Sequence, residues 1–232
     1  MAELSERDAL KKAAAYRAIE FVEDGMTVGL GTGSTAYFVV EGLGERVKNG
    51  LKITGIPTSE RTATQARGLG IHLATFAEHP TIDLTIDGAD EVERSTLNLI
   101  KGLGGALLRE KIVAAASRKL VIVVDQEKLV DRLGDHTPVP VEVVQFGWQA
   151  TSAALSKLGA EPVLRHAHED HPFITDGGNY TLDCRFQRID DGKELERQIN
   201  AIVGVVDCGL FISRASAVIV AAADGIHVMN AP

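Results

Sequence analysis

Acidic residues crowd into one short segment of the chain. The segment DLTIDGADEV, residues 83–92, carries Asp87, Asp90 and Glu91 at the end of a strand-like run. Carboxylates this close in sequence repel one another, so the cluster needs a reason. A solvated turn is one interpretation, because Asp-Gly is a common turn pair, and we accept it for Glu91. The alternative is that a bound molecule requires the other two acids.

A glycine-rich segment, GLGTGST at residues 29–35, joins a predicted strand to a predicted helix. Such a turn presents backbone N–H groups at a helix N-terminus, which is a natural site for an anion. Ser34 and Thr35 can add hydroxyl donors. The segment is not a dinucleotide fingerprint, because Ser34 replaces the third glycine, and no Gly-Lys-Ser/Thr of a Walker A loop follows. We favour a phosphate site over a turn that serves only tight packing.

A second glycine-rich turn, KGLGGALLREK at residues 101–111, begins with Lys101. Two such turns in one chain suggest backbone that approaches a ligand closely. The helix that follows carries Arg109, Glu110 and Lys111. Charges on exposed helices are commonplace. The pattern alone therefore favours a solvated face over catalysis for Glu110, and it predicts surface charges for Arg109 and Lys111.

The elements that must position these residues alternate between strands and helices. A helix is expected over residues 5–22, with Ser5 and Asp8 in an arrangement like a capping box. Apolar runs such as 120–124 are typical of strands that are buried on both faces of a parallel sheet. Ligands gather outside the carboxyl ends of strands in such sheets. The first glycine turn and the acidic segment can therefore face one crevice.

The pattern changes near Gly134 to β-α-β-β-α-β, the ferredoxin-like order. Residues 179–189 alternate, which places Tyr180, Leu182, Cys184 and Phe186 on one face. We therefore expect an α/β protein with a Rossmann-like domain, built on a mainly parallel sheet, over residues 1–133 and 207–232. An inserted ferredoxin-like α+β domain is expected over residues 134–206.

Composition narrows the classes of function. The chain has 232 residues, of which 45% are hydrophobic and 24% charged, an ordinary globular balance. Its apolar runs are too short to span a bilayer, its N-terminus has no signal-peptide pattern, and Cys184 and Cys208 fit reduced, buried thiols. A cytoplasmic protein without membrane partners is expected.

The net charge argues against a nucleic-acid site, and the position of the histidines argues against a metal site. The net charge of −8 argues against nucleic acid as the main partner, although it allows a small phosphorylated substrate. His166, His168 and His171 lie in the expected hairpin loop of the inserted domain, away from both glycine turns. Because metal sites need converging ligands on a supporting framework, we expect no metal there.

In this order and at these separations, GLGTGST, DLTIDGADEV and IKGLGGALLREK resemble ribose-5-phosphate isomerase of type A, along nearly the whole chain. The resemblance implies interconversion of D-ribose 5-phosphate and D-ribulose 5-phosphate in the non-oxidative pentose phosphate pathway. It implies no metal or organic cofactor and a homodimer or homotetramer. The pocket residues that it implies are Thr32, Gly33, Ser34, Thr35, Asp87, Gly88, Ala89, Asp90, Lys101, Gly102, Leu103, Gly104 and Lys128. The family usually has glycine at the position of Leu103.

The same resemblance matches Glu110 to the family's proton acceptor. Aldose–ketose isomerisation must open a furanose ring, move a proton between C1 and C2, and stabilise an enediolate. Glu110 would be the general base for the C–H proton, and Asp87 would assist ring opening and shuttle hydroxyl protons. Lys101 would offset the enediolate charge, and Asp90 would orient the sugar hydroxyls.

Two other classes of function remain as alternatives. An amino-sugar phosphate deaminase or a CoA transferase would share the phosphate loop, but would need another catalytic set in place of Asp87, Lys101 and Glu110. A sugar-phosphate sensor of transcription regulators should carry a basic helix-turn-helix domain. This acidic chain shows no such domain.

Overall fold

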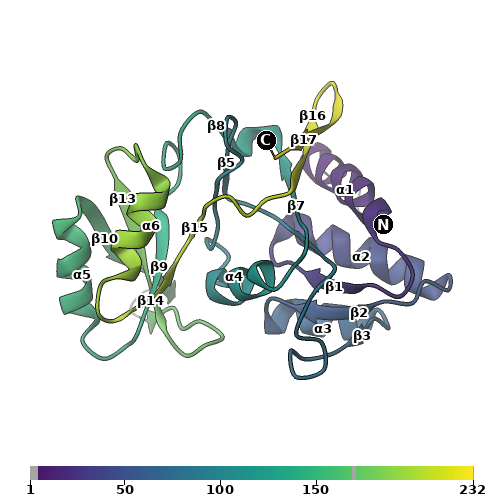
Figure 1. Ribbon diagram of the computed structural model, residues 1–232, viewed down its shortest axis with the longest axis horizontal. Helices are drawn as coiled ribbons and strands as arrows, with labels where there is room; N and C mark the ends of the chain where they lie inside the picture. The colour runs from purple at the N-terminus through teal and green to yellow at the C-terminus, as the bar shows by residue number, and fades with distance from the viewer. Residues whose placement is uncertain (1–4, 169–170, 232) are drawn as a thin grey trace. The chain divides into compact units, whose positions relative to one another are not determined.

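The computed structural model describes residues 5–168 and 171–231, which pack into two compact units (Figure 1). The first unit comprises Met1–Ala89, Arg109–Lys128 and Arg214–Pro232, and the second comprises Asp90–Leu108 and Leu129–Ser213. These units begin and end at other residues than the domains expected from the sequence, since residues 90–108 pack with the second unit. The division at residues 134 and 206 stays a prediction.

A seven-stranded sheet forms the centre of the first unit, in the order β17-β16-β7-β4-β1-β2-β3. Its strands are β1 (Thr27–Leu30), β2 (Thr54–Pro57), β3 (His72–Leu73), β4 (Leu84–Asp87), β7 (Leu120–Asp125), β16 (Ala217–Ala222) and β17 (Gly225–Asn230). Neighbours are parallel except β16 and β17. From β1 the chain adds β2 and β3 on one side of the sheet, and from β4 it adds β7, β16 and β17 on the other side. The Rossmann-like prediction is confirmed, and the order reverses between β1 and β4, where such sheets bind ligands.

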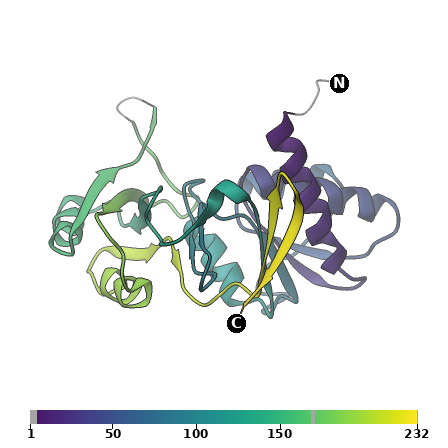
Figure 2. The same cartoon turned by 90° about the horizontal axis from the view of Figure 1, so that it is seen from above.

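Helices cover both faces of this sheet. They are α1 (Glu6–Ala18), η1 (Ile19–Phe21), α2 (Ser34–Lys48), α3 (Glu60–Gly68) and α4 (Leu107–Ala115), the last belonging to this unit from Arg109 onward. Ala14 of α1 and Leu43 of α2 pack in one buried cluster with Leu30 and Ile86 of the strands. Val113 of α4 packs in another with Ile82. Figure 2 shows α1 lying along β16 and β17.

The N-terminal helix is shorter than expected. The Ser5 Oγ accepts the Asp8 N–H at 3.1 Å, which confirms the predicted cap. The α-helix ends at Ala18, however, and continues only as the 3₁₀ turn η1. Val22 has extended backbone angles (φ −88°, ψ 122°), so the helical run ends at Phe21, one residue before the expected end. The apolar spacing of the sequence continues past the point where the chain turns toward β1.

The ferredoxin-like order is confirmed in the second unit. Its elements are β9 (Val139–Val143), α5 (Trp148–Lys157), β10 (Ala160–Leu164), β13 (Tyr180–Phe186), α6 (Gly192–Asn200) and β14 (Val205–Cys208). They form an antiparallel sheet in the order β10-β13-β9-β14. Leu182, Cys184 and Phe186 are buried on one face, where they pack with Leu155 of α5 and Ile199 of α6.

Two smaller sheets complete the second unit. The hairpin β11 (His166–His168) and β12 (His171–Pro172) is inserted between β10 and β13. A four-stranded sheet has the order β15-β6-β5-β8, formed by β15 (Leu210–Phe211), β6 (Leu99–Ile100), β5 (Glu91–Glu93) and β8 (Leu129–Val130). The 3₁₀ turn η2 (Gln126–Lys128) belongs to the first unit and directly precedes β8.

The Glu91 carboxylate is buried and binds backbone N–H groups, so it is not a solvated charge. Its side chain is buried, its Oε1 accepts the N–H groups of His136 (2.8 Å) and Thr137 (2.6 Å), and its Oε2 accepts that of Gly134 (2.6 Å). The expectation of a solvated Glu91 is therefore wrong. Its partners lie more than forty positions away, so local sequence could not reveal them.

The two cysteines are buried thiols, as expected. Burial raises the pKa of the Cys184 thiol well above its usual range, so this group stays protonated at neutral pH. Along residues 5–168 and 171–231, no helix combines the length and the apolar character that crossing a bilayer requires.

Glu91→Gln should destabilise the protein by about 1–3 kcal/mol, because the new NH₂ group must face a backbone donor that the carboxylate now binds. The free energy of unfolding in urea measures this. The control is Glu161→Gln, which changes an exposed carboxylate on β10 and should cost less than about 0.5 kcal/mol. Equal effects of the two substitutions would contradict the internal role.

Candidate active site

Two of the predicted motifs meet where the sheet order reverses. The glycine loop, residues 31–35, follows β1, and Asp87 ends the neighbouring parallel strand β4. The Thr32 N–H donates to Asp87 Oδ1 at 3.0 Å, and the Gly88 N–H donates to the same oxygen at 2.8 Å. Only 2% of Asp87 is exposed. Two backbone donors therefore fix its carboxylate against the loop.

Gly31 permits this close approach. A Cβ at residue 31 would lie 2.2 Å from Asp87 Oδ1 and 2.6 Å from Asp87 Cα. Neither distance leaves room for a carbon atom, and the second involves backbone, which cannot rotate away. The first glycine of the loop is thus required by the packing of Asp87. The glycine pattern alone predicts an anion site but not this reason.

Helix α2 begins without a capping side chain. Its N-cap is Gly33, whereas Ser59 and Asp191 accept backbone N–H groups at the starts of α3 and α6. The first N–H groups of any helix lack intrahelical acceptors, and the helix dipole favours negative charge there. Ser34 is exposed and Thr35 is half-buried at this end. The arrangement suits an anion.

Helix α4 carries Glu110 toward the same end of the sheet. The C-terminal end of α4 is fixed at the start of β4, because Ala116 O accepts the Ile82 N–H at 2.9 Å. One turn earlier, Val113 lies against Gly29 of β1, where an added Cβ would be 2.7 Å from its Cγ1. Glu110 is a further turn toward the N-terminus. It therefore lies on the side of the carboxyl ends of β1 and β4.

The expected solvated face of α4 is only partly correct. Arg109 is a surface charge, as predicted, and its Nη1 lies 2.8 Å from Glu60 Oε1. Glu110 and Lys111, however, are only 4% and 5% exposed, so the prediction for them is wrong. Sequence periodicity reveals the apolar stripe of a helix, but not the tertiary packing that covers the polar positions beside it.

A third strand end brings Lys128 to this edge. The turn η2 follows β7, which pairs with β4, and Lys128 in that turn is half-buried. Asp125, the last residue of β7, is a buried acid outside the three predicted motifs. The sequence feature that could have identified Asp125 is a charged residue at the end of an otherwise apolar strand, LVIVVD at residues 120–125. Charges in that position of a parallel sheet commonly face a ligand.

The second glycine turn belongs to the second unit. Lys101 is 2% exposed, and its side-chain Nζ lies 5.5 Å from the centroid of the Phe211 ring. Its backbone N–H donates to Gly209 O at 2.9 Å. Gly102 has a φ of +110°, a conformation that side chains rarely adopt. The structure brings Asp90 to this turn, since its Oδ2 accepts the Leu103 N–H at 2.9 Å. The Leu103 amide is thus held by the protein itself, while Leu103 and Gly104 are exposed.

Arg165 is a second support for this turn that no sequence pattern indicated. Its Nη1 donates to Gly102 O at 2.8 Å and to Leu103 O at 3.1 Å. The other side of the guanidinium forms a forked pair with Asp183, whose Oδ2 lies 2.9 Å from Nε. The turn is therefore fixed through its carbonyl groups by Arg165 and through an amide by Asp90.

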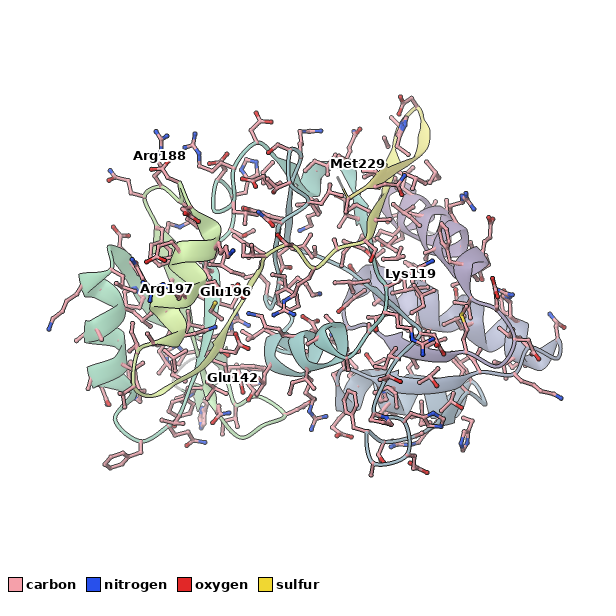
Figure 3. All side chains as sticks on the ribbon, in the orientation of Figure 1. Lys119, Glu142, Arg188, Glu196, Arg197 and Met229 are labelled. Carbon is pink, nitrogen blue, oxygen red and sulfur yellow. The ribbon has the colours of Figure 1, made fainter. Side chains whose placement is uncertain are left out.

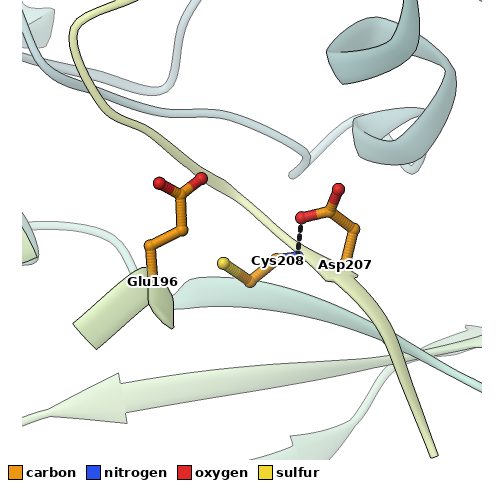
Figure 4. Close-up of side chains that lie close together, drawn as sticks. All are labelled: Glu196, Asp207 and Cys208. Carbon is orange, nitrogen blue, oxygen red and sulfur yellow. Dashed lines mark hydrogen bonds between the residues drawn. The ribbon is translucent and has the colours of Figure 1, made fainter. Parts of the chain in front are cut away.

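One cavity and one side-chain cluster among the described residues contain none of the predicted pocket residues. A cavity of about 470 Å³ lies between α3 and α4, with apolar walls that include Phe76 and Ile112. Within the described part of the chain, ligand atoms of Glu196, Asp207 and Cys208 lie within 4.8 Å of one another (Figure 4). Glu196 is next to Arg197 on α6 (Figure 3). The histidines of β11 and β12 are exposed and do not belong to that cluster.

Comparison with known proteins identifies close relatives. A sequence model of the family described as "Ribose 5-phosphate isomerase A (phosphoriboisomerase A)" matches residues 54–225. Ribose-5-phosphate isomerase A of Gloeobacter violaceus is 63% identical over 223 residues, covering 96% of each chain. The structure of ribose 5-phosphate isomerase A from Methanocaldococcus jannaschii matches with a TM-score of 0.93 and 42% identity, over 97% of this chain and 100% of that chain. A D-ribose-5-phosphate isomerase in complex with phospho-erythronic acid has a TM-score of 0.94 and 41% identity, over 97% of this chain and 99% of that chain.

Gly31→Ala should destabilise the protein by about 1–3 kcal/mol, because the added methyl group must displace Asp87. The measurement is the free energy of unfolding. Gly68→Ala in α3 is the control, since nothing lies within 4 Å of the Cβ that it would add, and alanine there should be neutral or favourable by up to about 1 kcal/mol. If Gly31→Ala were as well tolerated as Gly68→Ala, Asp87 would not be packed against the loop.

Proposed function

The chain belongs to the ribose-5-phosphate isomerase A family and interconverts D-ribose 5-phosphate and D-ribulose 5-phosphate. We propose that this reaction takes place at the carboxyl ends of β1 and β4, where the strand order of the large sheet reverses. Glu110 is the proton acceptor in this proposal. The observation that carries it is the burial of Glu110 on the N-terminal half of α4, on the side of the strand ends where Asp87 meets the glycine loop. A buried carboxylate at a strand-end site is placed for proton transfer.

The phosphate group binds at the N-terminus of α2. The amides of residues 33–35 and the hydroxyl groups of Ser34 and Thr35 supply donors for its oxygens. The solved relative with phospho-erythronic acid is consistent with this class of ligand, because that molecule joins a phosphate to a carboxylate. A planar, negatively charged carboxylate resembles an enediolate, and enzymes bind such mimics of the transition state tightly.

The proton moves between neighbouring carbons of the open-chain sugar. Starting from the aldose, the Glu110 carboxylate takes the proton from C2, and the electron pair shifts so that the carbonyl oxygen on C1 becomes negative. Glu110 then returns the proton to C1, and O2 loses its own proton to become the ketone. Asp87 assists ring opening and exchanges the hydroxyl protons between O1 and O2. Burial keeps the abstracted proton from bulk water.

The second glycine turn supplies the positive charge. Lys101 offsets the charge on the enediolate oxygen, and contacts to the Phe211 ring and to Gly209 O support its position. Asp90 orients sugar hydroxyls while it holds the Leu103 amide. Lys128 binds the ligand from the strand end of β7. Gly88, Ala89, Gly102, Leu103 and Gly104 line the pocket in this proposal.

The wider setting follows from the same assignment. We place the reaction in the non-oxidative pentose phosphate pathway of the cytoplasm, where cysteines such as Cys184 and Cys208 stay reduced. The proposal assigns no metal and no organic cofactor to the chemistry. Matches over 96% and 97% of the chain to named isomerases favour this function over a deaminase or a CoA transferase on a similar scaffold.

The protein forms a homodimer or homotetramer in this proposal. Phe146 and Val203 are 94% and 93% exposed, and their loops are joined by a hydrogen bond from the Val144 N–H to Gly204 O (2.9 Å). Val144 and Val206 are also exposed nearby along the chain. Large apolar side chains gathered on one surface commonly mark a contact with another protein, and a second copy of the chain is the most frequent partner.

Glu110→Gln should lower kcat by about 10²–10⁴-fold, the usual contribution of a general base, with little change in KM. Steady-state formation of ribulose 5-phosphate from ribose 5-phosphate, with a chelator present, measures both parameters. The neighbouring Arg109→Gln is the control, because Arg109 is a surface charge. A Glu110→Gln enzyme with wild-type kcat would remove Glu110 from the proton transfer, and loss of wild-type activity in chelator would contradict a metal-free reaction.

Phe146→Ser should shift the protein toward a smaller assembly, because it removes the most exposed large apolar side chain of this surface. Light scattering on a size-exclusion column gives the molar mass. Ile112→Ser, an exposed position on α4 in the other unit, should leave the mass unchanged. An oligomer that survives Phe146→Ser at micromolar concentration would place the contact elsewhere.

A further inference from the structure

Four buried hydroxyl groups pack together beside the glycine loop. We call Thr32, Thr58, Ser59 and Thr62 the hydroxyl cluster. Thr32 belongs to the loop, whereas the others lie between the end of β2 and the first turn of α3. The exposed fractions are 7%, 0%, 6% and 4%, so water contributes little to their hydrogen bonding. The cluster lies wholly within the first unit.

Thr32 is the centre of the cluster. Its Oγ1 lies 2.7 Å from Thr58 Oγ1, 2.8 Å from Ser59 Oγ and 3.0 Å from Thr62 Oγ1. The hydroxyl of Thr58 also donates to Leu30 O, and that of Thr62 donates to Gly31 O, both at 3.0 Å. Three consecutive residues of the chain, 30–32, are therefore held from the side of β2 and α3.

The protons of the cluster are fully used. Its four hydroxyl groups take part in six oxygen–oxygen contacts of 3.0 Å or less. One consistent arrangement sends the protons of Thr58 and Thr62 to the two loop carbonyls. Ser59 then donates to Thr62, and Thr32 donates to Ser59. Removing the Thr62 hydroxyl would take from Gly31 O the donor that it binds, and leaving a buried acceptor unsatisfied costs more than the bond itself is worth. Removing the Thr58 hydroxyl would cost less, because Leu30 O also accepts the Thr58 backbone N–H at 3.0 Å.

The loop is held from its other side by β4. The Gly31 N–H donates to Ile86 O at 3.0 Å, and the Thr32 N–H donates to Asp87 Oδ1 at 3.0 Å. The N–H groups of residues 31 and 32 are thus bound by β4, and the carbonyl groups of residues 30 and 31 by the hydroxyl cluster. A loop fixed in this way loses little conformational entropy when an anion binds, so binding is tighter.

We propose that Thr58, Ser59 and Thr62 are positioning residues that hold the glycine loop in the conformation in which the amides at the start of α2 face the phosphate. The proposal rests on the phosphate position given under the proposed function. None of the three residues touches the substrate or takes part in proton transfer. Their loss should therefore weaken binding of the phosphate group and leave the chemical step nearly unchanged.

The test is Thr58→Val and Thr62→Val, which remove one hydroxyl each and keep the branched shape. KM for ribose 5-phosphate and the inhibition constant of inorganic phosphate should both rise about 10-fold, and kcat should change by less than about 2-fold. Thr58→Ser and Thr62→Ser, which keep the hydroxyl, should restore most of the affinity. Thr64→Val is the matched control on the same helix, because Thr64 is exposed and its hydroxyl donates to Glu60 O of its own helix, away from the loop.

Folded valine variants with wild-type phosphate inhibition, or with a lower kcat at unchanged KM, would overturn the proposal. If circular dichroism shows that the valine variants are unfolded, Ser59→Ala takes their place, with the same expected changes in KM, kcat and phosphate inhibition. Ser34→Glu separates this proposal from the phosphate position itself, since it places a negative charge at the exposed start of α2. Weak phosphate inhibition in Ser34→Glu with unaffected valine variants refutes only the positioning role. Unaffected inhibition in Ser34→Glu refutes the phosphate position, and the positioning role with it.

Discussion

The carboxylate of Asp87 ties two diverging parts of the sheet together. It accepts the Thr32 N–H of the loop after β1 and the Gly88 N–H at the end of its own strand. The chain leaves β1 and β4 in opposite directions, and this opens a crevice beyond the ends of the two paired strands. The buried carboxylate closes its floor, and Gly31 is required because the carboxylate occupies the space of a side chain. The loop that leads into α2 is held by this contact on one side and by the hydroxyl cluster on the other.

Buried charges serve the same purpose in the second unit. Glu91 binds three backbone N–H groups of the segment 134–137, and Arg165 binds two carbonyl groups of the turn after Lys101. A buried charge is costly unless it is paired or hydrogen-bonded. Here the backbone supplies most of the partners, so the side chains fix loops that have no regular structure. The glycine-rich turn after Lys101 is therefore held in one conformation by side chains from other segments of the chain.

Elements with local signals were predictable, and contacts between distant segments were not. The alternation of strands and helices, the ferredoxin-like unit and the Ser5 cap follow from apolar periodicity and capping residues, which act within a few positions. The burial of Glu91 and Lys111 and the role of Arg165 depend on partners or packing far along the chain, so the local pattern suggested surface charges or nothing. Glu110 was selected only through the resemblance of its motif, because its helix reads as solvated. The hydroxyl cluster escaped notice for a related reason, since threonine and serine near a helix start usually signal a cap.

The central claim is that the phosphate binds at the start of α2 and that the reacting carbons face Glu110. A crystal structure of this protein with phospho-erythronic acid tests it most directly. The account predicts phosphate oxygens within about 2.7–3.2 Å of the amides of residues 33–35, with the carboxylate end of the ligand beside Glu110 and Asp87. A phosphate bound away from α2, for example in the cavity between α3 and α4, or a ligand whose carboxylate is remote from Glu110, would contradict it.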